Sequence, residues 1–249
     1  MSDSGSRIGI TFALPSESSD LVRRLRAIER SDNSLSGKIE NPEKIGAREV
    51  FRSRDVTILH TGVGAKNCNE RLEILLHKMR PRLVISSGFA GAVSEQLRVG
   101  DLVLAQNFSD SQLLASAERI LRDRQPRLVK LFTSTSIIDS VSERNEIARA
   151  SGAAAVDMET GAIVAVCNAH SIPVLSLRGI SDTASQPFPM PPSVLFDIKR
   201  QQTSYVRLFA YLLRDPASIS GLIRFARRIA QVRAALTEAI VDLVHHIDW

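Results

Sequence analysis

Cysteine is scarce in this 249-residue sequence: Cys68 and Cys167 stand alone, without a CxxC spacing. A zinc site and a disulfide framework are therefore not indicated. No apolar run approaches the roughly 18 residues that a membrane span needs. The first ten residues lack the basic and then apolar pattern of a signal peptide. We therefore expect a cytoplasmic protein without a metal site.

Aromatic residues are also few, at 5%, although the formal net charge is +5. Single-stranded nucleic acid is usually bound by basic patches interleaved with aromatic residues. That pattern is missing, so we expect no nucleic-acid partner. The sequence is 44% hydrophobic and 24% charged, which is ordinary for a globular protein long enough to bury a sizeable core.

The common nucleotide-binding motifs are absent as well. The stretch "TGVGAKN" (61–67) is neither GxGxxG nor a Walker loop, because Lys66 is not preceded by Gly-x-x-x-x-Gly. A dinucleotide or triphosphate site is therefore disfavoured. Glycines in this stretch and in "SSGFAGA" (86–92) still allow backbone N–H groups to approach a ligand closely. A nucleoside, a phosphate or a sugar remains compatible with them.

Strand-like runs alternate with helical patterns of about ten residues along the chain. The clearest runs are "RIGITFAL", "PRLVISSGFAG", "AAAVDM" and "IPVLSL". This alternation predicts an α/β fold with a largely parallel central sheet. Ligands of such folds bind beyond the carboxyl ends of the strands. Polar residues that follow apolar runs are therefore candidate site residues.

Three carboxylates occupy such positions: Glu17 follows the first run, Glu159 follows "AAAV", and Asp182 follows "PVLSL". Each one alone is explained by the electrostatics of a helix N-terminus or by capping of a helix or turn. One strand-helix-strand passage links Glu159 to Asp182, which favours neighbouring positions at one sheet edge. The three together, beside two glycine-rich strand exits, indicate a shared site.

The block "AAAVDMETGAIVAVCNAHSIPVLSLRGISDTA" (153–184) resembles the signature of the purine nucleoside phosphorylase and 5′-methylthioadenosine/S-adenosylhomocysteine nucleosidase superfamily. There, a strand ends in Val-(Glu/Asp)-Met-Glu, and a helix and a strand lead to Arg-x-Ile-Ser-Asp. "GITFALPSESSDL", "TGVGAKN" and "ISSGFAGAVSEQLRVGDLVLA" are similar to earlier family segments, in the right order. The resemblance covers about residues 7 to 185.

The resemblance implies a three-layer α/β/α sandwich with a central mixed, largely parallel sheet. It places a nucleoside phosphorylase-like domain over residues 7–190. We expect residues 191–249 to form a helical C-terminal extension, packed on the same domain or at a subunit interface. Family analogy implies a homodimer or larger homo-oligomer and no cofactor.

Roles follow from the resemblance residue by residue. Asp182 would be the general acid at purine N7, positioned by Ser181. Glu159, with Met158, would hold the ribose hydroxyls, and Glu17 would orient or deprotonate the attacking water. Arg178 would help to hold that water or a phosphate. The remaining positions fall into a purine-binding set and a nucleophile or phosphate loop: Ile137, Ile138, Phe89, Ala90 and Gly91 in the first, and Gly62, Gly64 and Ser87 in the second.

Members of the superfamily differ in their nucleophile, which is water in the nucleosidases and phosphate in the phosphorylases. Bacterial phosphorylases carry an arginine just before the glycine-rich exit of the middle strand, where this sequence has Ser86 and Ser87. We therefore expect hydrolysis of a purine nucleoside, similar to methylthioadenosine/S-adenosylhomocysteine nucleosidases, with release of adenine. Phosphorolysis stays an alternative, because Arg48, Arg52 and Arg54 offer cations for a phosphate.

Two departures from the family leave further alternatives open. Phe89 replaces a serine of the nucleosidases, and "SQPFPMPP" (185–192) replaces a polar stretch. These changes are compatible with an unusual 5′-substituted or lipid-linked adenosine as substrate. They are also compatible with a catalytically silent nucleoside-binding protein.

The chain after Pro192 has a helical pattern. Apolar residues recur on one face of the last helix: Leu222, Phe225, Ile229, Val232, Leu236, Ile240 and Leu243. Arg224, Arg227, Arg228 and Arg233 fall mostly elsewhere. A basic amphipathic helix can bind an anionic membrane surface. Packing against the domain or a second subunit is the favoured explanation, and membrane association is the alternative.

Overall fold

A computed structural model describes residues 8–31, 43–45, 48–52, 56–185, 196–197, 202–203 and 218–247. The strands are β1 (Ile8–Phe12), β2 (Glu43–Ile45), β3 (Arg48–Arg52), β4 (Val56–His60), β5 (Leu83–Ala92), β6 (Leu102–Ala105), β7 (Arg127–Val129), β8 (Leu131–Thr133), β9 (Ala155–Asp157), β10 (Val174–Asp182), β11 (Phe196–Asp197) and β12 (Gln202–Thr203). The helices are α1 (Pro15–Ser31), α2 (Ala65–Met79), α3 (Ser111–Ile120), α4 (Val141–Ser151), α5 (Thr160–Ala169) and α8 (Ser218–His246), with 3₁₀ turns at Gln106–Phe108 and Arg122–Arg124.

The main sheet is mixed, with a parallel centre. Its strand order is β2-β3-β4-β1-β5-β10-β6-β7, and β9 pairs with the end of β5 and with β8. The strands β4, β1, β5 and β10 run parallel, whereas β6 is antiparallel to β10. The predicted α/β class and the mixed, largely parallel sheet are confirmed. The carboxyl ends of β1, β4, β5 and β10 consequently meet along one edge.

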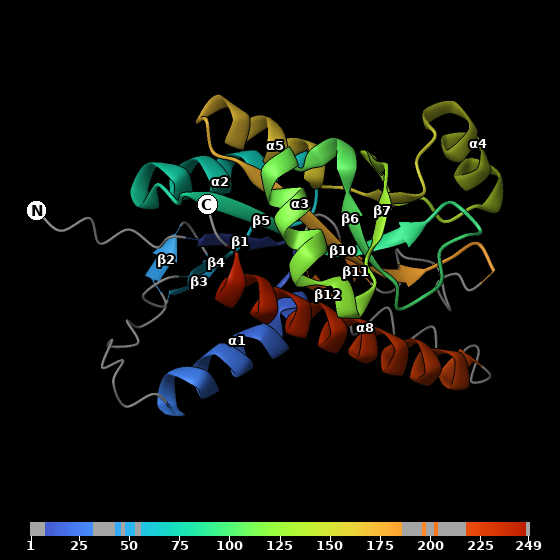
Figure 1. The fold of residues 1–249 in the computed structure, drawn as a ribbon. Coiled ribbons are helices and arrows are strands. Elements are labelled where there is room, and N and C mark those ends of the chain that lie inside the picture. The colour runs from blue at the N-terminus through green and yellow to red at the C-terminus, as the bar shows by residue number, and fades with distance from the viewer. Residues whose placement is uncertain are drawn as a thin grey trace, which may run out of the picture.

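Helices cover both faces of this sheet. Figure 1 shows α2 and α5 on one side and α1 and α8 on the other. The first pair forms a buried cluster with β4, β5 and β10 around Cys68, Leu72 and Cys167. The second pair, together with α3, packs on β1, β4, β5, β6 and β10. The molecule is therefore a three-layer sandwich.

Alternation along β10 explains a polar sequence in a fully buried strand. Every residue of β10 is buried. Leu175 and Leu177 point into the α1/α8 cluster, while Val174 belongs to the α2/α5 cluster. Because successive side chains face opposite sides of a strand, Arg178 lies on the α5 side. The arginine is thus directed toward the helix that follows β9.

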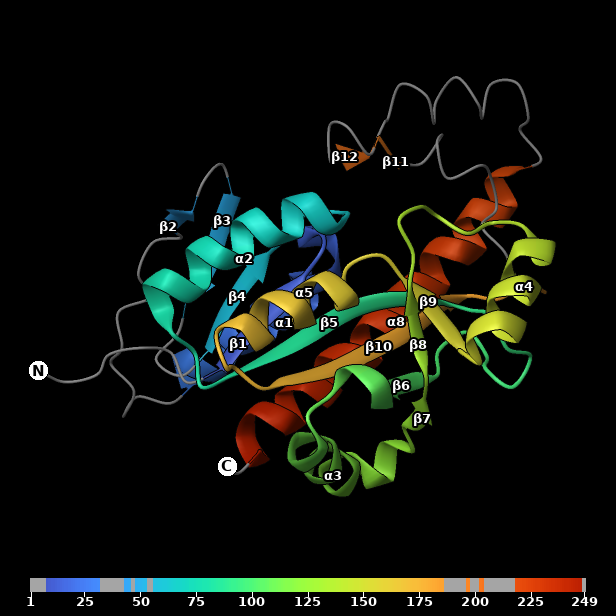
Figure 2. The ribbon, with the colours of Figure 1, turned by 90° about the horizontal axis from the view of Figure 1, so that it is seen from above.

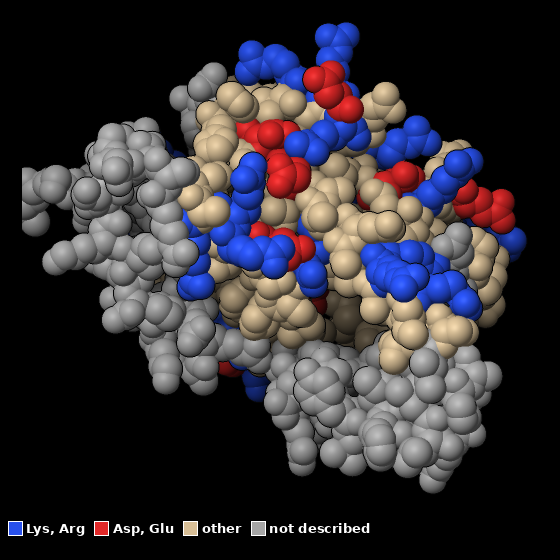
Figure 3. All heavy atoms as spheres, turned by 90° about the horizontal axis from the view of Figure 1, so that it is seen from below, with Lys and Arg blue, Asp and Glu red and all other residues tan. Residues whose placement is uncertain are grey.

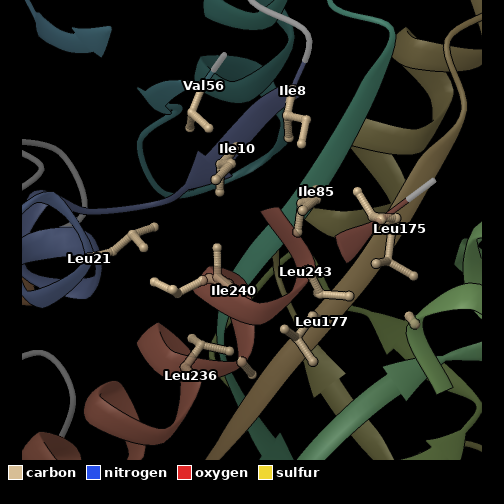
Figure 4. Close-up of a cluster of buried hydrophobic side chains, with 14 of the residues drawn as sticks. Ile8, Ile10, Leu21, Val56, Ile85, Leu175, Leu177, Leu236, Ile240 and Leu243 are labelled. Atoms are coloured by element: carbon tan, nitrogen blue, oxygen red, sulfur yellow. The ribbon is translucent and has the colours of Figure 1, made fainter. Parts of the chain in front are cut away.

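The last helix completes the larger core. Figure 4 shows Leu236, Ile240 and Leu243 of α8 directed toward side chains of β1, β5 and β10. Each fully buried aliphatic side chain contributes about 1.5–3 kcal/mol of transfer free energy. Val232 is also buried, whereas Leu222, Phe225 and Ile229 are only partly buried. The apolar face expected from the sequence is therefore deeply buried only in its second half.

One expectation for the C-terminal region is wrong. Residues Phe196–Asp197 and Gln202–Thr203 pair as antiparallel strands, where the sequence pattern predicted helix. The run "SVLFDI" is short and mostly apolar, and its periodicity does not distinguish a short strand from a helix. The part of the expected helical pattern at residues 204–217 lies outside the described residues. The division into 7–190 and 191–249 stays a prediction.

The outer side of α1 and α8 carries charges of both signs. Figure 3 shows Lys and Arg side chains interspersed with Asp and Glu on this side of the molecule. Arg233 of α8 pairs with Asp20 of α1 at 2.7 Å, and Arg24 of α1 lies 3.7 Å from Glu238. None of the helices among the described residues is long and apolar enough to span a bilayer.

Candidate active site

Glu17 lies in the first turn of α1, just past the end of β1. One carboxylate oxygen accepts the Leu14 N–H at 2.9 Å, and the other accepts the Phe89 N–H of β5 at 3.4 Å. A Cβ at Gly88 would lie 3.2 Å from the same carboxylate, a tight contact, and φ at Gly88 is +145°, which side chains rarely adopt. Burial raises the pKa of Glu17, although the Leu14 N–H and Arg178 counteract this. Glu17 is therefore held against the exit of β5.

Glu159 is the N-cap residue of α5, but its side chain forms no hydrogen bond with the first turn of the helix. Its carboxylate instead accepts the backbone N–H of Gly64 at 2.9 Å. Gly64 has φ 87° and ψ 151°, a backbone conformation that glycine adopts readily. Burial and the neighbouring Asp157 carboxylate raise the pKa of Glu159 to about 8, with a smaller contribution from Glu17. The glycine-rich turn thus binds a carboxylate of the protein itself.

Arg178 of β10 is almost completely buried. It lies close enough to Glu17 and Glu159 to lower the pKa of both. Its Nε–H donates to Asp157 at 3.1 Å, and its Nη1 donates to the carbonyls of Ser86 and Leu177. Its Nη2 donates to the hydroxyls of Ser86 and Thr160. All five N–H groups therefore have protein acceptors. In this structure no N–H of Arg178 is left to hold water or phosphate directly. Arg178 therefore fixes the positions of Asp157, Ser86 and Thr160 around the site.

Asp157 completes this buried network. Thr133 donates its hydroxyl to one carboxylate oxygen at 3.0 Å. The other oxygen accepts Arg178 and both the N–H and the hydroxyl of Thr160. Asp157 thus joins β9, β10 and the start of α5 around one ion pair. The sequence resemblance contained this residue in its Val-(Glu/Asp)-Met-Glu pattern but gave it no role.

Asp182 ends β10, opposite Gly91 of β5, and a bulge lies between Ile180 and Asp182. Bulges of this kind redirect side chains at strand ends. Ser181 donates its hydroxyl to Asp182 Oδ1 at 2.6 Å. Asp182 Oδ2 accepts a buried hydrogen bond from Nη2 of Arg144 on α4. The sequence motifs did not identify Arg144, although it contacts a predicted catalytic group.

Of the predicted purine-binding residues, Ile138 lies in a small core cluster with Val93 and Val156. Ile137 and Phe89 are partly exposed, and Ala90 is buried. Met158 is partly buried beside Glu159. Ile138 therefore contributes to packing, whereas Ile137 and Phe89 keep some accessible surface.

The predicted nucleophile loop follows β4. The Gly62 N–H donates to the Ala13 carbonyl at 3.0 Å, which ties this loop to the end of β1. The buried Ser87 hydroxyl has no hydrogen-bond partner within the described part of the chain. No group of three or more His, Cys, Asp or Glu side chains in that part is arranged to hold a metal ion.

The predicted acid and the predicted water-binding glutamate meet β5 at separate points. Glu17 contacts the strand at residues 88–89, and Asp182 lies opposite residue 91. These contact points are two to three residues apart, which is about 7–10 Å along a strand. The two groups thus stand at opposite ends of one short strand segment, with Glu159 near the Glu17 end.

Comparisons with known proteins agree with this architecture. A 5′-methylthioadenosine/S-adenosylhomocysteine nucleosidase of Staphylococcus haemolyticus is 26% identical over 199 residues, covering 66% of this chain and 87% of the relative. The fold is similar to futalosine hydrolase of Helicobacter pylori, with a TM-score of 0.69, 15% identity and coverage of 97% and 98%. It is also similar to the S. pneumoniae methylthioadenosine/S-adenosylhomocysteine nucleosidase, with a TM-score of 0.69, 19% identity and coverage of 97% and 99%.

The family model described as the phosphorylase superfamily matches residues 7–118 and 106–214. These matches include β5 and β10, which contain Phe89 and Asp182, and β1 and β9, which are followed by Glu17 and Glu159. The resemblance found in residues 153–184 is therefore confirmed, and the chain belongs to the phosphorylase superfamily.

Proposed function

We propose that the chain hydrolyses the N-glycosidic bond of a purine nucleoside, as the nucleosidases among its relatives are named to do. The observation that carries this proposal is that Glu17 contacts β5 at residues 88–89 and Asp182 lies opposite residue 91, so that their contact points are about 7–10 Å apart along the strand. That separation accommodates a ribose and its base between Glu17, which takes a proton from the attacking water, and Asp182, which donates a proton to the leaving purine.

The chemistry follows from these positions. As the C1′–N9 bond breaks, its electron pair leaves with the purine, and the carboxyl proton of Asp182 moves to N7. A water oxygen bonds to C1′, and Glu17 takes the proton that this water loses. Glu159 holds the ribose hydroxyls while positive charge develops on the sugar. The same division of labour operates in glycoside hydrolysis.

Water is the better nucleophile for this site. A phosphate dianion requires a cationic cradle, but the protein engages every N–H of Arg178. The carboxyl group of Glu17, when ionised, would repel an anion. The side chains of Arg48, Arg52 and Arg54 lie outside the described residues. Hydrolysis is therefore the proposed reaction, and phosphorolysis is the alternative that an assay must distinguish.

The purine would lie along β5 beside Phe89, Ala90 and Gly91, with Ile137 at its side. Met158 would contact the ribose next to Glu159. The partial exposure of Phe89, Ile137 and Met158 supports these positions. We further expect a cytoplasmic homodimer or larger assembly, in line with the family.

An assay of purine release, with and without phosphate, distinguishes hydrolysis from phosphorolysis. Methylthioadenosine, S-adenosylhomocysteine, adenosine, inosine and futalosine are incubated with the enzyme, with and without phosphate. We expect hydrolysis of at least one of them at a rate that phosphate leaves unchanged. A strict requirement for phosphate would establish the phosphorylase alternative. Absence of base release from all five substrates would contradict the proposal and favour a silent binding protein.

Variants then test the residues. Asp182→Asn, Glu159→Gln and Glu17→Gln should each lose about 100-fold or more in kcat, because each removes a group that acts on the reacting atoms. Glu146→Gln is the control, since Glu146 lies exposed on α4. Circular dichroism shows whether each variant is folded. Near-normal turnover in a folded Asp182→Asn protein would contradict the mechanism.

A further inference from the structure

Arg144 is an unusual residue for its helix. Its neighbours on α4, Glu143, Glu146 and Arg149, are exposed, whereas Arg144 is only 1% exposed. Figure 2 shows α4 beyond the ends of β5 and β10. A buried ion pair is often no more stabilising than apolar side chains of the same volume. Stability alone therefore does not account for a buried guanidinium here.

The guanidinium of Arg144 joins three segments at the end of the site where the purine is proposed to bind. Nη1 donates to the carbonyl of Ala92 at 2.8 Å, at the end of β5. Nη2 donates to the carbonyl of Ile138 at 3.1 Å and pairs with Asp182 Oδ2. Within the described residues, Arg144 is the one charged side chain that contacts Asp182. Its contacts fix the carboxyl group relative to both the sheet and the segment before α4.

The surroundings leave little freedom to this pair. A Cβ at Gly91 would lie 3.2 Å from Asp182 Oδ2 and 3.4 Å from Arg144 Nη1. Ser181 holds the other oxygen, Oδ1, at 2.6 Å. Arg144 and Ser181 therefore each take one oxygen of Asp182. This fixes the plane of the carboxyl group, so that Oδ1 and Oδ2 differ in their surroundings.

We propose that Arg144 is a positioning residue for Asp182 that assists departure of the base. The inference rests on the proposed function. Before proton transfer, Arg144 donates a hydrogen bond to the neutral carboxyl group of Asp182. When the proton moves from Asp182 to purine N7, the aspartate becomes a carboxylate and forms a full ion pair with the guanidinium. Arg144 therefore interacts more strongly with the state after proton transfer than with the state before it. Interactions of this kind raise kcat rather than binding affinity.

The test compares two leaving groups. A purine needs a proton to depart, whereas p-nitrophenol leaves p-nitrophenyl β-D-ribofuranoside as an anion without one. Arg144→Met should lower kcat on the best purine nucleoside by about 100-fold, at the lower end of the usual contribution of acid catalysis, with KM almost unchanged. Its loss on the riboside should be much smaller. Asp182→Asn should show the same selective loss.

Arg149→Met is the matched control, because it makes the same substitution at an exposed position of the same helix. It should leave both substrates at wild-type rates. Arg144→Lys keeps the charge with a different donor geometry and should recover part of kcat. If Arg144→Met does not fold by circular dichroism, Arg144→Lys takes its place, with the same selective loss expected to a smaller degree.

Two results would overturn the inference while leaving the proposed function intact. One is an equal loss on both substrates in a folded Arg144 variant, which would mean a general structural role. The other is unchanged kcat on the nucleoside in Arg144→Met. If the wild-type enzyme releases base from no nucleoside, the proposed function itself fails, and this inference fails with it.

Discussion

The carboxylate of Glu159 accepts a hydrogen bond from the backbone N–H of Gly64, 95 residues earlier in the chain, at 2.9 Å. This bond joins the residue before α5 to the turn before α2. In many nucleotide sites, such a glycine turn offers its N–H groups to a phosphate. Here it is engaged with a carboxylate, which agrees with a site that is proposed to bind a ribose and water.

The burial of Glu159 has a consequence for stability against pH. Its pKa is about 8 in the folded chain, against an ordinary value of 4.5. Between these values the folded chain keeps a proton that the unfolded chain has released, so this residue makes the free energy of unfolding fall as pH rises. Glu159→Gln should remove this contribution. Urea titrations should show the variant equal to wild type near pH 4.5 and increasingly more stable toward pH 8.

The exposed Glu146→Gln is the comparison for that experiment. It makes the same substitution at an exposed position, so its stability curve measures the general effect of replacing Glu by Gln. If the Glu159→Gln curve runs parallel to that of Glu146→Gln, Glu159 does not keep its proton in the folded chain.

Gly64→Ala should weaken substrate binding. An added Cβ would meet no atom within 4 Å, but φ is +87°, so relief of strain would rotate the N–H away from Glu159. A non-glycine residue in such a region costs about 1–3 kcal/mol. We expect a lower free energy of unfolding and a raised KM for the nucleoside. Gly152→Ala, also at positive φ with open space around it, should lower stability without changing KM.

Gly179→Ala should disturb the packing of α8 on β10. Its Cβ would lie 2.5 Å from Val232 Cγ1, too close for any real contact. Overpacking of this kind costs about 1–3 kcal/mol. Val232→Ala removes the obstructing methyl groups, so the double variant should be more stable than the sum of the two single losses predicts. Urea unfolding of all four proteins measures this coupling, and strict additivity would contradict it.

Arg178→Met should be strongly destabilising, because it leaves Asp157 buried without its cation. Removal of one partner from a buried pair costs about 3–5 kcal/mol. Adding Asp157→Asn removes the uncompensated charge and should restore part of that loss. Arg178→Lys should not substitute, since three donors cannot replace the five N–H groups of a guanidinium. The midpoints of thermal unfolding test the series, and a fully stable Arg178→Met would contradict the role assigned to the network.

Local pattern was sufficient to predict the strands and helices that carry the three carboxylates. The alternation of strands and helices places each of Glu17, Glu159 and Asp182 after or at the end of a strand. The parallel strands β1 and β10 end at the same edge as β5, whereas β9 is antiparallel to β5 and pairs with its carboxyl end. The hydrogen-bond partners of Arg178 could not be predicted in this way. Its five acceptors come from four residues, and Ser86 lies 92 positions away in the sequence.

Arg144 was missed because α4 has a polar sequence and Asp182 lies 38 positions further on. A weak signal was present. Arg144, Ile147 and Ala148 share the i, i+3, i+4 spacing of one helix face, and the two apolar members pack beside the cluster of Val93, Ile138 and Val156. A charged residue on an otherwise inward face is worth noting in similar sequences. The strands at 196–197 and 202–203 were missed because the short-range pattern fits both structures.

The core formed by β1 and α8 also constrains how this protein can be made. Ile8 and Ile247 belong to one buried cluster, yet a ribosome delivers residues at about 5–20 per second. The first strand therefore waits on the order of ten seconds or more for the helix that covers it. During that time its apolar side chains are exposed on a nascent chain. We expect slow synthesis or early termination to yield chains that chaperones retain or proteases remove.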